Sequence, residues 1–573
     1  MRQTVAMEPI SRRLFLAGSA AVVVVAGCSD DDDNEPSGSS PTAAASDPAA
    51  RAIDTADVPD TTEGSTPPAP TAPPVTDAPL PTQPAIVLES DPFTLGVASG
   101  DPGVGSVVLW TRLAPEPLAT GGGMPGDDIQ VDWEVALDPD FAEVRFTGST
   151  TATAEHAHSV HVHAQIDTGN AYHYRFHTGG HTSPVGRTRT APSMSGEPES
   201  VRFASASCQH YESGYYVAHR DIASQQPDFV VWLGDYIYEG GAGVVGQNDN
   251  VRTHGAPEVT SLDEYRGRYA LYKSDAHLQA AHAACPWLVT WDDHEVENNY
   301  AGGVPQDDAD QPAFAQRRHD AYQAWWEHQP VDLPPPVLGE DFPIYRSLRW
   351  GALMTVAVLD GRQYRSDQAC GGATLDLDPP CAQTFDESRT MIGEAQERWL
   401  FDELNASPAT WNVIAQQTLF GDVTLGGAVL NYDQWDGYPV QRNRIVDRLA
   451  SDSIQDVVVL TGDIHFAGTG IIRSGGRGTG TPVAVEFVAT SISSGGRIDP
   501  GVTAVVQAIP DIVDAELEHR GYILHTVTPT QWQAQYRMAE TVKQPDATMF
   551  QHAIYNIDVG TNVVTIAEGI VRG

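Results

Sequence analysis

The sequence predicts a mixed α/β domain preceded by a small β-sandwich. From about residue 198 onward, apolar runs of strand length alternate with helical patterns, which is typical of an α/β domain. From about 86 to 192, short β runs follow one another with turn signals and without helical patterns, as in a small sandwich. We therefore expect four segments: a signal (1–28), an acidic tether (29–84), a β-sandwich (85–192) and an α/β domain (193–573).

The composition excludes some functions and favours others. The 573 residues include 33 Lys+Arg against 76 Asp+Glu, a formal net charge of −43, and the only lysines are Lys273 and Lys543. Such an acidic chain is a poor candidate for a nucleic-acid-binding surface or for binding anionic membranes, but it suits hard cations. Since 12 Trp, 19 Tyr and 15 Phe need a core in which to pack, disorder throughout the chain is excluded.

The N-terminus has the features of an export signal. Ser11-Arg12-Arg13-Leu14-Phe15-Leu16 fits the twin-arginine pattern, and the apolar run that follows ends at Val25 and is too short to span a membrane. Val25-Ala26-Gly27-Cys28 resembles a lipobox, in which the cysteine is acylated. We expect twin-arginine export to the cell surface, the periplasm or the extracellular space, with a lipid anchor at Cys28. An ordinary cleaved secretion signal is the alternative.

The segment between this signal and the first β run is acidic and poor in apolar side chains. Residues 30–84 are rich in Pro, Ala, Thr and Asp, and their net charge is −10. Such a segment cannot bury enough apolar area to offset the entropy lost on ordering, and its charges repel one another. We therefore interpret it as an extended tether.

The other cysteines and a group of histidines have different interpretations. Cys370 and Cys381 bracket a Gly/Asp/Pro loop, which we expect them to close as a disulfide in an oxidising compartment. Cys285 lies in an apolar run and is interpreted as a core residue. Four histidines crowd one β region of the predicted sandwich, but no pattern completes a metal site there, so we interpret them as solvent-facing: His156, His158, His161 and His163.

Four predicted strands of the α/β domain end at residues that can bind metals. In open α/β sheets the loops beyond the carboxyl ends of the strands form the site, so we expect these four ends to meet. Any one of them alone is more often a helix cap or a turn, whereas four together favour a functional site. The ends carry Cys208, then Asp235 and Tyr238, then Asp292, Asp293 and His294, and finally Asp463 and His465.

The chemistry of these side chains suits a pair of metal ions. Unpaired buried carboxylates are costly, and few basic residues lie near them in the sequence. Asp235 could bridge both ions, while the thiolate of Cys208 and the phenolate of Tyr238 favour ferric iron in one position. The oxygen-rich remainder suits a divalent ion. The neighbouring Tyr236 and Trp291 are interpreted as packing residues or as part of the pocket wall.

Longer motifs around these residues resemble those of the PhoD-type alkaline phosphatases, the alkaline phosphatase D family. The resemblance covers about 90–540, including the opening of the predicted sandwich. The motifs are Phe203-Ala-Ser-Ala-Ser-Cys-Gln, Leu233-Gly-Asp-Tyr-Ile-Tyr-Glu, Thr290-Trp-Asp-Asp-His-Glu-Val-Glu-Asn-Asn-Tyr and Leu460-Thr-Gly-Asp-Ile-His.

The resemblance implies a fold, a pair of cofactors and a set of site residues. The implied fold is a calcineurin-like metallophosphatase core of two β-sheets flanked by helices, preceded by a fibronectin-like or immunoglobulin-like sandwich. The implied cofactors are Fe3+ and Ca2+, with other divalent ions as substitutes. His294 matches the residue that donates a proton to the leaving oxygen, and either Gln416 or Gln417 is a candidate for a further ligand. The implied metal ligands are Cys208, Asp235, Tyr238, Asp293, Asp463 and His465.

We therefore expect a metal-dependent hydrolase of small phosphate esters, in which a metal-bound hydroxide attacks phosphorus in line. A phospholipase-D-like phosphodiesterase with the same metals is one alternative. A non-catalytic metal-binding surface protein is another, although His294 beside the ligands favours an enzyme. We expect a monomer that touches the membrane only through its anchor at Cys28.

Overall fold

The computed structural model describes residues 87–244, 249–306, 311–372, 378–451, 454–495 and 506–569. The predicted signal, with Cys28, and the predicted tether lie outside the described residues. Within the described ranges, no helix has the length and apolar character needed to cross a membrane.

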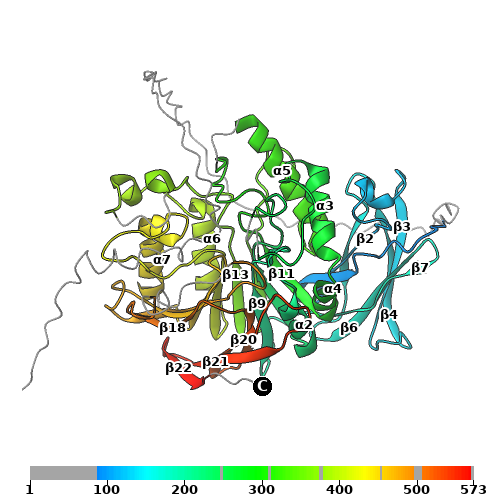
Figure 1. Cartoon of the computed structure of the whole chain (residues 1–573). Helices are drawn as coiled ribbons and strands as arrows, with labels where there is room; N and C mark the ends of the chain where they lie inside the picture. The colour runs from blue at the N-terminus through cyan, green and yellow to red at the C-terminus, as the bar shows by residue number, and fades with distance from the viewer. Residues whose placement is uncertain are drawn as a thin grey trace, which may run out of the picture. The chain divides into compact units, whose positions relative to one another are not determined.

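A ten-stranded mixed sheet runs through the molecule in the order β22-β21-β20-β19-β9-β10-β11-β1-β2-β5 (Figure 1). Its centre, β9-β10-β11-β1, is parallel, and the other neighbours are antiparallel. The strands are β1 (Val97–Gly103), β2 (Ser106–Arg112), β5 (Ser159–Gln165), β9 (Val201–Ala206), β10 (Phe229–Leu233), β11 (Pro286–Thr290), β19 (Arg520–Val527), β20 (Gln531–Ala539), β21 (Met549–Asp558) and β22 (Val564–Glu568).

Two further sheets complete the β structure. The seven-stranded sheet has the order β12-β13-β14-β15-β17-β16-β18, with β13, β14, β15 and β17 parallel. Its strands are β12 (Arg346–Trp350), β13 (Met354–Val358), β14 (Trp411–Ala415), β15 (Val457–Thr461), β16 (Ala467–Arg473), β17 (Pro482–Val488) and β18 (Ile512–Glu516). The five-stranded sheet contains β3 (Ile129–Ala136), β4 (Val144–Ala152), β6 (Ala171–Thr178), β7 (His181–Thr182) and β8 (Gly186–Arg189).

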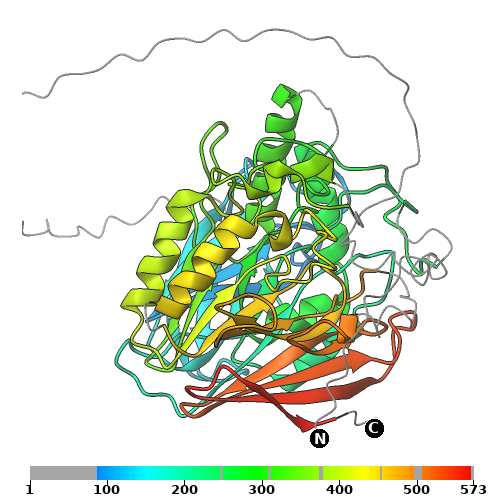
Figure 2. The same cartoon turned by 90° about the vertical axis from the view of Figure 1, so that its left-hand side faces the viewer.

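The helices cover the outer faces of the two large sheets. Figures 1 and 2 show α6 and α7, in yellow-green and yellow, on the opposite side of the sheets from α3, α4 and α5. The helices are α2 (Val217–Gln225), α3 (Leu262–Lys273), α4 (Ala276–Ala284), α5 (Gln311–His328), α6 (Gly393–Ala406) and α7 (Pro439–Ser451).

Alternating side chains of each buried strand reach two different cores, as the period of a strand requires. Phe203 and Val231 face the seven-stranded sheet and pack with Val413 and Val458 in the central core. Their neighbours along the chain face the other way, toward helices α2 to α5, so Ala204, Val230 and Trp232 belong to the core on that side. The structure therefore confirms the expected core of two sheets flanked by helices.

The N-terminal β region shares a sheet with the α/β core. Strand β1 pairs in parallel with β11, Ser99 opposite Pro286, so that β1, β2 and β5 extend the ten-stranded sheet. These strands pack against the five-stranded sheet through Leu109, Val131 and Tyr174, among other residues. The two β layers thus form a sandwich whose one sheet continues into the core.

The prediction of solvent-facing histidines is wrong for part of that group. His163 is exposed and pairs with Asp332. His158 is buried, with Nε2 lying 2.9 Å from the carbonyl of Asp127. His161 stacks on the Trp326 ring, with centroids 4.4 Å apart, because helix α5 covers this part of the sheet.

Candidate metal centre

Five parallel strands bring their carboxyl ends to one edge of the two large sheets. Strands β9, β10 and β11 are neighbours in the ten-stranded sheet, and β15 and β17 are neighbours in the seven-stranded sheet. Ser207, just after β9, forms a parallel bridge with Ser491, just after β17, so the two sheets meet at these ends. The four predicted strand ends therefore converge, together with a fifth, after β17, that the sequence analysis missed.

The backbone at these ends adopts a conformation that non-glycine residues rarely take. The φ angles of Cys208, Asp235, Asp463 and His465 are 57°, 58°, 62° and 53°. Each such residue costs on the order of 1–3 kcal/mol, a strain that persists where surrounding structure enforces it and that clusters at functional sites. Glycine is required at position 234, just before Asp235, because a Cβ there would lie 2.5 Å from Cβ of Asp292. All four of these strained residues belong to the groups of potential metal ligands at the strand ends.

The converging side chains form three overlapping groups that could hold a metal ion. In each group the ligand atoms lie within 4.8 Å of one another, and Asp235 belongs to all three. The Tyr238 hydroxyl donates to Oδ2 of Asp235 at 2.9 Å and lies 3.1 Å from Nε2 of His465. The groups are Cys208, Asp235 and His465; Asp235, Asp293 and His294; and Asp235, Asp292, Asp293 and Asp463.

The structure thus brings together the six residues that the resemblance implies as metal ligands, and it adds Asp292. Asp292 was expected at a strand end but not as a ligand. Its Oδ2 is buried and has no hydrogen-bond partner among the described residues, and the same is true of Oδ1 of Asp235. Buried carboxylate oxygens without donors are costly in a protein and suit a bound cation, so the cluster fits a metal site.

The raised pKa values of two carboxylates also fit a metal site. Burial, together with the nearby carboxylates of Asp293 and Asp463, raises the pKa of Asp235 to about 7. Burial and Asp293 likewise raise the pKa of Asp463 to about 6. These shifts arise because like charges crowd a site that excludes water. A metal cation would remove that penalty and keep the carboxylates ionised.

His294 is held by a carboxylate that the sequence analysis did not single out. Nδ1 of His294 lies 2.7 Å from Oε2 of Glu239, and the other oxygen of Glu239 accepts the Asn298 N–H at 2.7 Å. Burial opposes ionisation of Glu239, but His294 and the Asn298 amide outweigh it and lower its pKa to about 2. An ionised Glu239 therefore fixes Nδ1 of His294 as a donor and leaves Nε2 as the other reactive nitrogen. The only signal for Glu239 in the sequence was its place at the end of the motif Leu233–Glu239.

A second glutamate ties two strand ends together. The carboxylate of Glu295 is buried and accepts the N–H groups of Asp235 at 3.0 Å, Tyr236 at 2.6 Å and Asp292 at 2.9 Å. The loops after β10 and β11, which carry most of the candidate ligands, are therefore joined through one side chain. Tyr236 and Trp291 are fully buried core residues, as predicted.

The two glutamines considered as ligands are both bonded to the protein framework. The Gln417 side chain donates to the carbonyls of Trp291 and Leu359 and accepts the Gly361 N–H at 3.0 Å. The Gln416 side chain donates to Thr461 Oγ1 and accepts from the Trp435 indole. Both amides brace the loops around the cluster, and we assign neither as a ligand.

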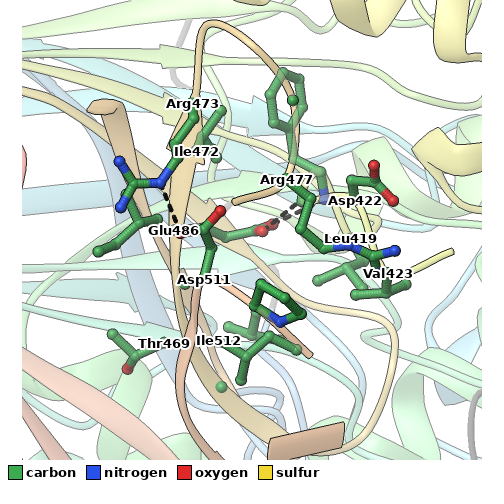
Figure 3. A pocket seen from close by; sticks show the side chains of 18 of the residues that line it. Leu419, Asp422, Val423, Thr469, Ile472, Arg473, Arg477, Glu486, Asp511 and Ile512 are labelled. Atoms are coloured by element: carbon green, nitrogen blue, oxygen red, sulfur yellow. Dashed lines mark hydrogen bonds and ion pairs between the residues drawn. The ribbon is translucent and has the colours of Figure 1, made fainter. Parts of the chain in front are cut away.

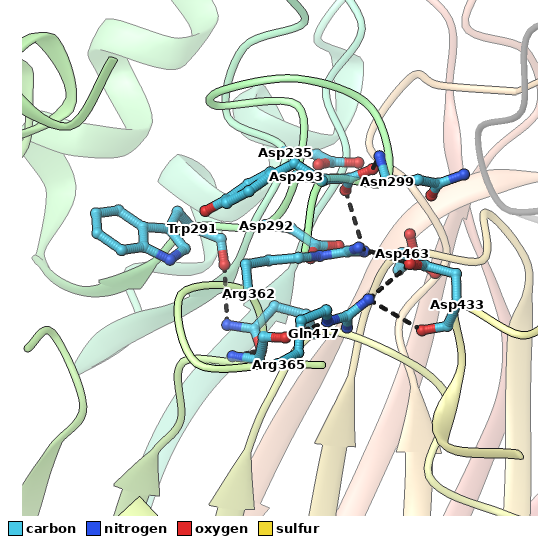
Figure 4. Close-up of polar contacts among 12 residues, drawn as sticks. Asp235, Trp291, Asp292, Asp293, Asn299, Arg362, Arg365, Gln417, Asp433 and Asp463 are labelled. Carbon is cyan, nitrogen blue, oxygen red and sulfur yellow. Dashed lines mark hydrogen bonds and ion pairs between the residues drawn. The ribbon is translucent and has the colours of Figure 1, made fainter. Parts of the chain in front are cut away.

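A buried ion-pair network lies against the carboxylates (Figure 4). Arg362 contacts Asp292, Asp293 and Asp433, and Arg365 donates to Asp433 at 2.6 Å. Both arginines come from the segment after β13, which is far from the strand ends in sequence. Sequence reasoning did not assign them, because nothing in the local pattern shows which carboxylates they pair with.

The loop closed by Cys370 and Cys381 adjoins this network. The two cysteines form a disulfide with their Cα atoms 5.9 Å apart. Gln368, two residues before the disulfide, donates to Asp433 at 2.7 Å and to the Asn299 carbonyl at 2.8 Å. The chain that leads into the disulfide loop is therefore bonded to Asp433 and to the loop that carries Asn299.

Two other features of the described residues are structural. His210, Glu212 and His254 lie together, but the Glu212 carboxylate already accepts the N–H groups of Gly243 and His254. A cavity of about 400 Å3 lies between α7, β16, β17 and β18 (Figure 3). No candidate ligand is among the described residues that line it, and several of its charged groups are bonded within the protein, as Arg473 is to Asp511 at 2.6 Å.

Known proteins are similar to this chain along most of its length. The sequence model of the PhoD-like phosphatase family matches residues 203–536, and the model of the PhoD-like phosphatase N-terminal domain matches residues 81–192. The chain is 45% identical to alkaline phosphatase D of Bacillus subtilis (strain 168) over 476 residues, covering 82% of this chain and 81% of the relative. A solved structure described as PhoD matches with a TM-score of 0.81 and 43% identity, covering 85% of this chain and 94% of that one. The chain belongs to the PhoD-like phosphatase family.

Proposed function

We propose that this PhoD-like phosphatase hydrolyses phosphate monoesters and diesters with two metal ions bound where the strand ends converge. The observation that carries the proposal is the position of Asp235. It belongs to all three groups of potential ligands at these strand ends and keeps one buried oxygen without a partner among the described residues. A carboxylate so placed suits a bridge between two ions.

The ligand types divide the site into two halves. Cys208, Tyr238 and His465 supply a thiolate, a phenolate and an imidazole, a set that supports ferric iron. Asp292, Asp293 and Asp463 supply carboxylates only, which suits calcium or another hard divalent ion. When bound, such a pair of ions lowers the pKa of a water molecule and neutralises the oxygens of a phosphoryl group.

The remaining chemistry falls to side chains of the chain itself. Because Glu239 accepts a hydrogen bond from Nδ1 of His294, a protonated His294 can release its proton only from Nε2. We assign His294 as the general acid that protonates the leaving oxygen. Glu239 stabilises the protonated ring and fixes its orientation, while the Glu295 carboxylate keeps the backbone of Asp235 and Asp292 in place.

The test is a metal analysis of the purified protein, combined with parallel assays on a matched monoester and diester at alkaline pH. We expect iron and calcium in comparable amounts, a visible charge-transfer absorption from the thiolate or phenolate, and turnover of both esters. A colourless, iron-free and fully active protein would overturn the iron assignment. A diester rate far above the monoester rate would favour the phospholipase-D-like alternative. Bound metal with no turnover of any ester would favour a binding protein.

We further propose a monomer exported through the twin-arginine route and anchored to the membrane by acylated Cys28. The arginine pair at Arg12 and Arg13 and the lipobox-like Val25–Cys28 support this proposal. We also infer that residues 29–84 link the anchor to the sandwich at 85–192 and the catalytic domain at 193–573. Cys28→Ala should move the protein from the membrane fraction to the soluble fraction without changing its specific activity. An unchanged distribution would refute the anchor.

A further inference from the structure

Arg362 lies inside the carboxylate cluster rather than at its edge (Figure 4). Its side chain is fully buried, and its Nε donates to Oδ1 of Asp292 at 2.5 Å. A terminal nitrogen of its guanidinium lies 3.2 Å from Asp293 and 2.8 Å from Asp433. Two carboxylates that are candidates for the divalent ion are therefore already paired with a cation of the protein.

The guanidinium also determines which oxygen can face an ion. Because Arg362 occupies Oδ1 of Asp292, Oδ2 is the oxygen left without a partner among the described residues. Asp433 holds Arg362 from the other side through both of its oxygens, at 2.9 and 2.8 Å. Arg362, held by Asp433, thus fixes the orientation of the Asp292 carboxylate before any ion binds, although other carboxylates lie close by.

The same arrangement changes the electrostatic potential at the carboxylates. A guanidinium stays protonated in proteins, and a positive charge a few ångströms from a cation site reduces the attraction for a divalent ion. Asp433 carries a negative charge that offsets part of this effect. The affinity of the carboxylates for their ion is thus the balance of a buried cation and its buried counter-ion.

We propose that Arg362 is a positioning residue that sets the affinity of the carboxylate half for its divalent ion and keeps that ion exchangeable. The inference rests on the proposed two-ion function. Its consequence is that activity follows the concentration of the divalent cation in the surrounding medium, while the ion on the side of Cys208 stays bound.

The test measures the dissociation constant of Ca2+ by calorimetry, with the full-length protein freed of exchangeable divalent ions by a mild chelator. Arg362→Met deletes the positive charge and should lower the dissociation constant by at least about tenfold, because charges interact strongly in a buried site. Asp433→Asn deletes the offsetting charge and should raise the constant by a similar factor. The double variant keeps the net charge of the cluster and should return close to the unaltered value.

The opposite signs separate the effect of charge from damage to the fold, because damage weakens Ca2+ binding in every variant. Arg365→Gln removes a charge that contacts Asp433 but, among the described residues, no candidate ligand. It should tighten Ca2+ binding by a smaller factor, and it decides the test if Arg362→Met does not fold. Arg473→Gln, which breaks an ion pair beside the separate cavity, is the control and should leave the constant unchanged.

Two results would overturn the inference in distinguishable ways. Weaker Ca2+ binding in both Arg362→Met and Arg365→Gln, with normal binding by the unaltered chain, would show that the arginines act only as structural supports. A failure of the unaltered chain to bind Ca2+ would contradict the calcium half of the proposed function, and with it the role of Arg362.

Discussion

The two halves of the metal centre orient their side chains in different ways. In the half with Cys208, Tyr238 and His465, three strand ends each supply one ligand type, and the Tyr238 hydroxyl links directly to Asp235 and His465. In the other half, Asp292 and Asp293 are paired with the buried cation Arg362. We infer that the first half holds a highly charged ion permanently through its ligand chemistry. For the second half we infer an ion whose affinity the protein adjusts through its own charges.

The largest effect is expected when the residue that both halves share, Asp235, is replaced. Asp235→Asn should lower turnover by at least about a thousandfold and release both metals, because it removes the bridging charge from the site. The measurement is metal content together with steady-state turnover. The Asn side chain is isosteric, so the change tests the charge and not the packing.

A matched control for Asp235 lies at the opposite end of a strand in the same core. Asp456, just before β15, accepts the Gly560 N–H and is also buried, but it is not part of any potential ligand group among the described residues. Asp456→Asn should leave metal content intact and change turnover by no more than a few-fold. Retention of both metals in Asp235→Asn would contradict the bridging role.

The next effect separates catalysis from metal binding. His294→Ala should lower turnover by about 10²–10⁴-fold, the range typical of a general acid, with the loss greatest for esters of poor leaving groups. Both metals should remain bound, because His294 is held by Glu239 and is assigned as a proton donor. Loss of a metal, or an equal loss of rate for good and poor leaving groups, would show that His294 is a ligand.

A third change affects only the half that contains Cys208. Cys208→Ser should remove or strongly shift the visible absorption and lower turnover by about a hundredfold, because a thiolate ligand to ferric iron is lost. Calcium binding to the carboxylates should persist. Cys285 is the matched control, since it is also a buried cysteine outside the disulfide but lies in the helix-side core, and Cys285→Ser should leave the spectrum unchanged. Unchanged absorption in Cys208→Ser would show that this cysteine is not a ligand.

The candidate ligands could be predicted because they follow strands that are easily read. Residues 229–233 and 457–461 are uninterrupted apolar runs that become β10 and β15, and parallel strands must place their ends together. These features depend on local sequence, so one sequence is enough to reveal them.

The supporting residues could not be predicted, because their roles depend on distant partners. Arg362 contacts Asp292 across 70 positions and Asp433 across 71, and Glu239 contacts His294 across 55. No local periodicity encodes such pairs. The sharing of one sheet by the N-terminal sandwich and the core, through the pairing of β1 with β11, was missed for the same reason.

The smallest effect concerns the orientation of His294. Glu239→Gln keeps an acceptor for Nδ1 but removes the charge that stabilises the protonated ring, so turnover should fall by about tenfold with both metals retained. The matched control is Glu297→Gln. Glu297 pairs with Arg317 and accepts the Gln306 N–H, and its replacement should leave turnover within about twofold. A loss as large as that of His294→Ala would mean that the charge of Glu239, rather than its geometry, is what the proton transfer requires.

The same carboxylate predicts a pH dependence of stability. In the folded protein the pKa of Glu239 is about 2, below its ordinary value of 4.5. The contribution of Glu239 to the free energy of unfolding is therefore fully present above about pH 4.5 and is lost as the pH falls toward 2. The full pKa shift corresponds to a contribution on the order of 3 kcal/mol to the free energy of unfolding. Denaturant unfolding of the metal-free protein at pH 5 and pH 3 should show a larger drop for the unaltered chain than for Glu239→Gln. Equal drops would mean that Glu239 does not carry this charge in the folded state, and the orientation of His294 would then need another cause.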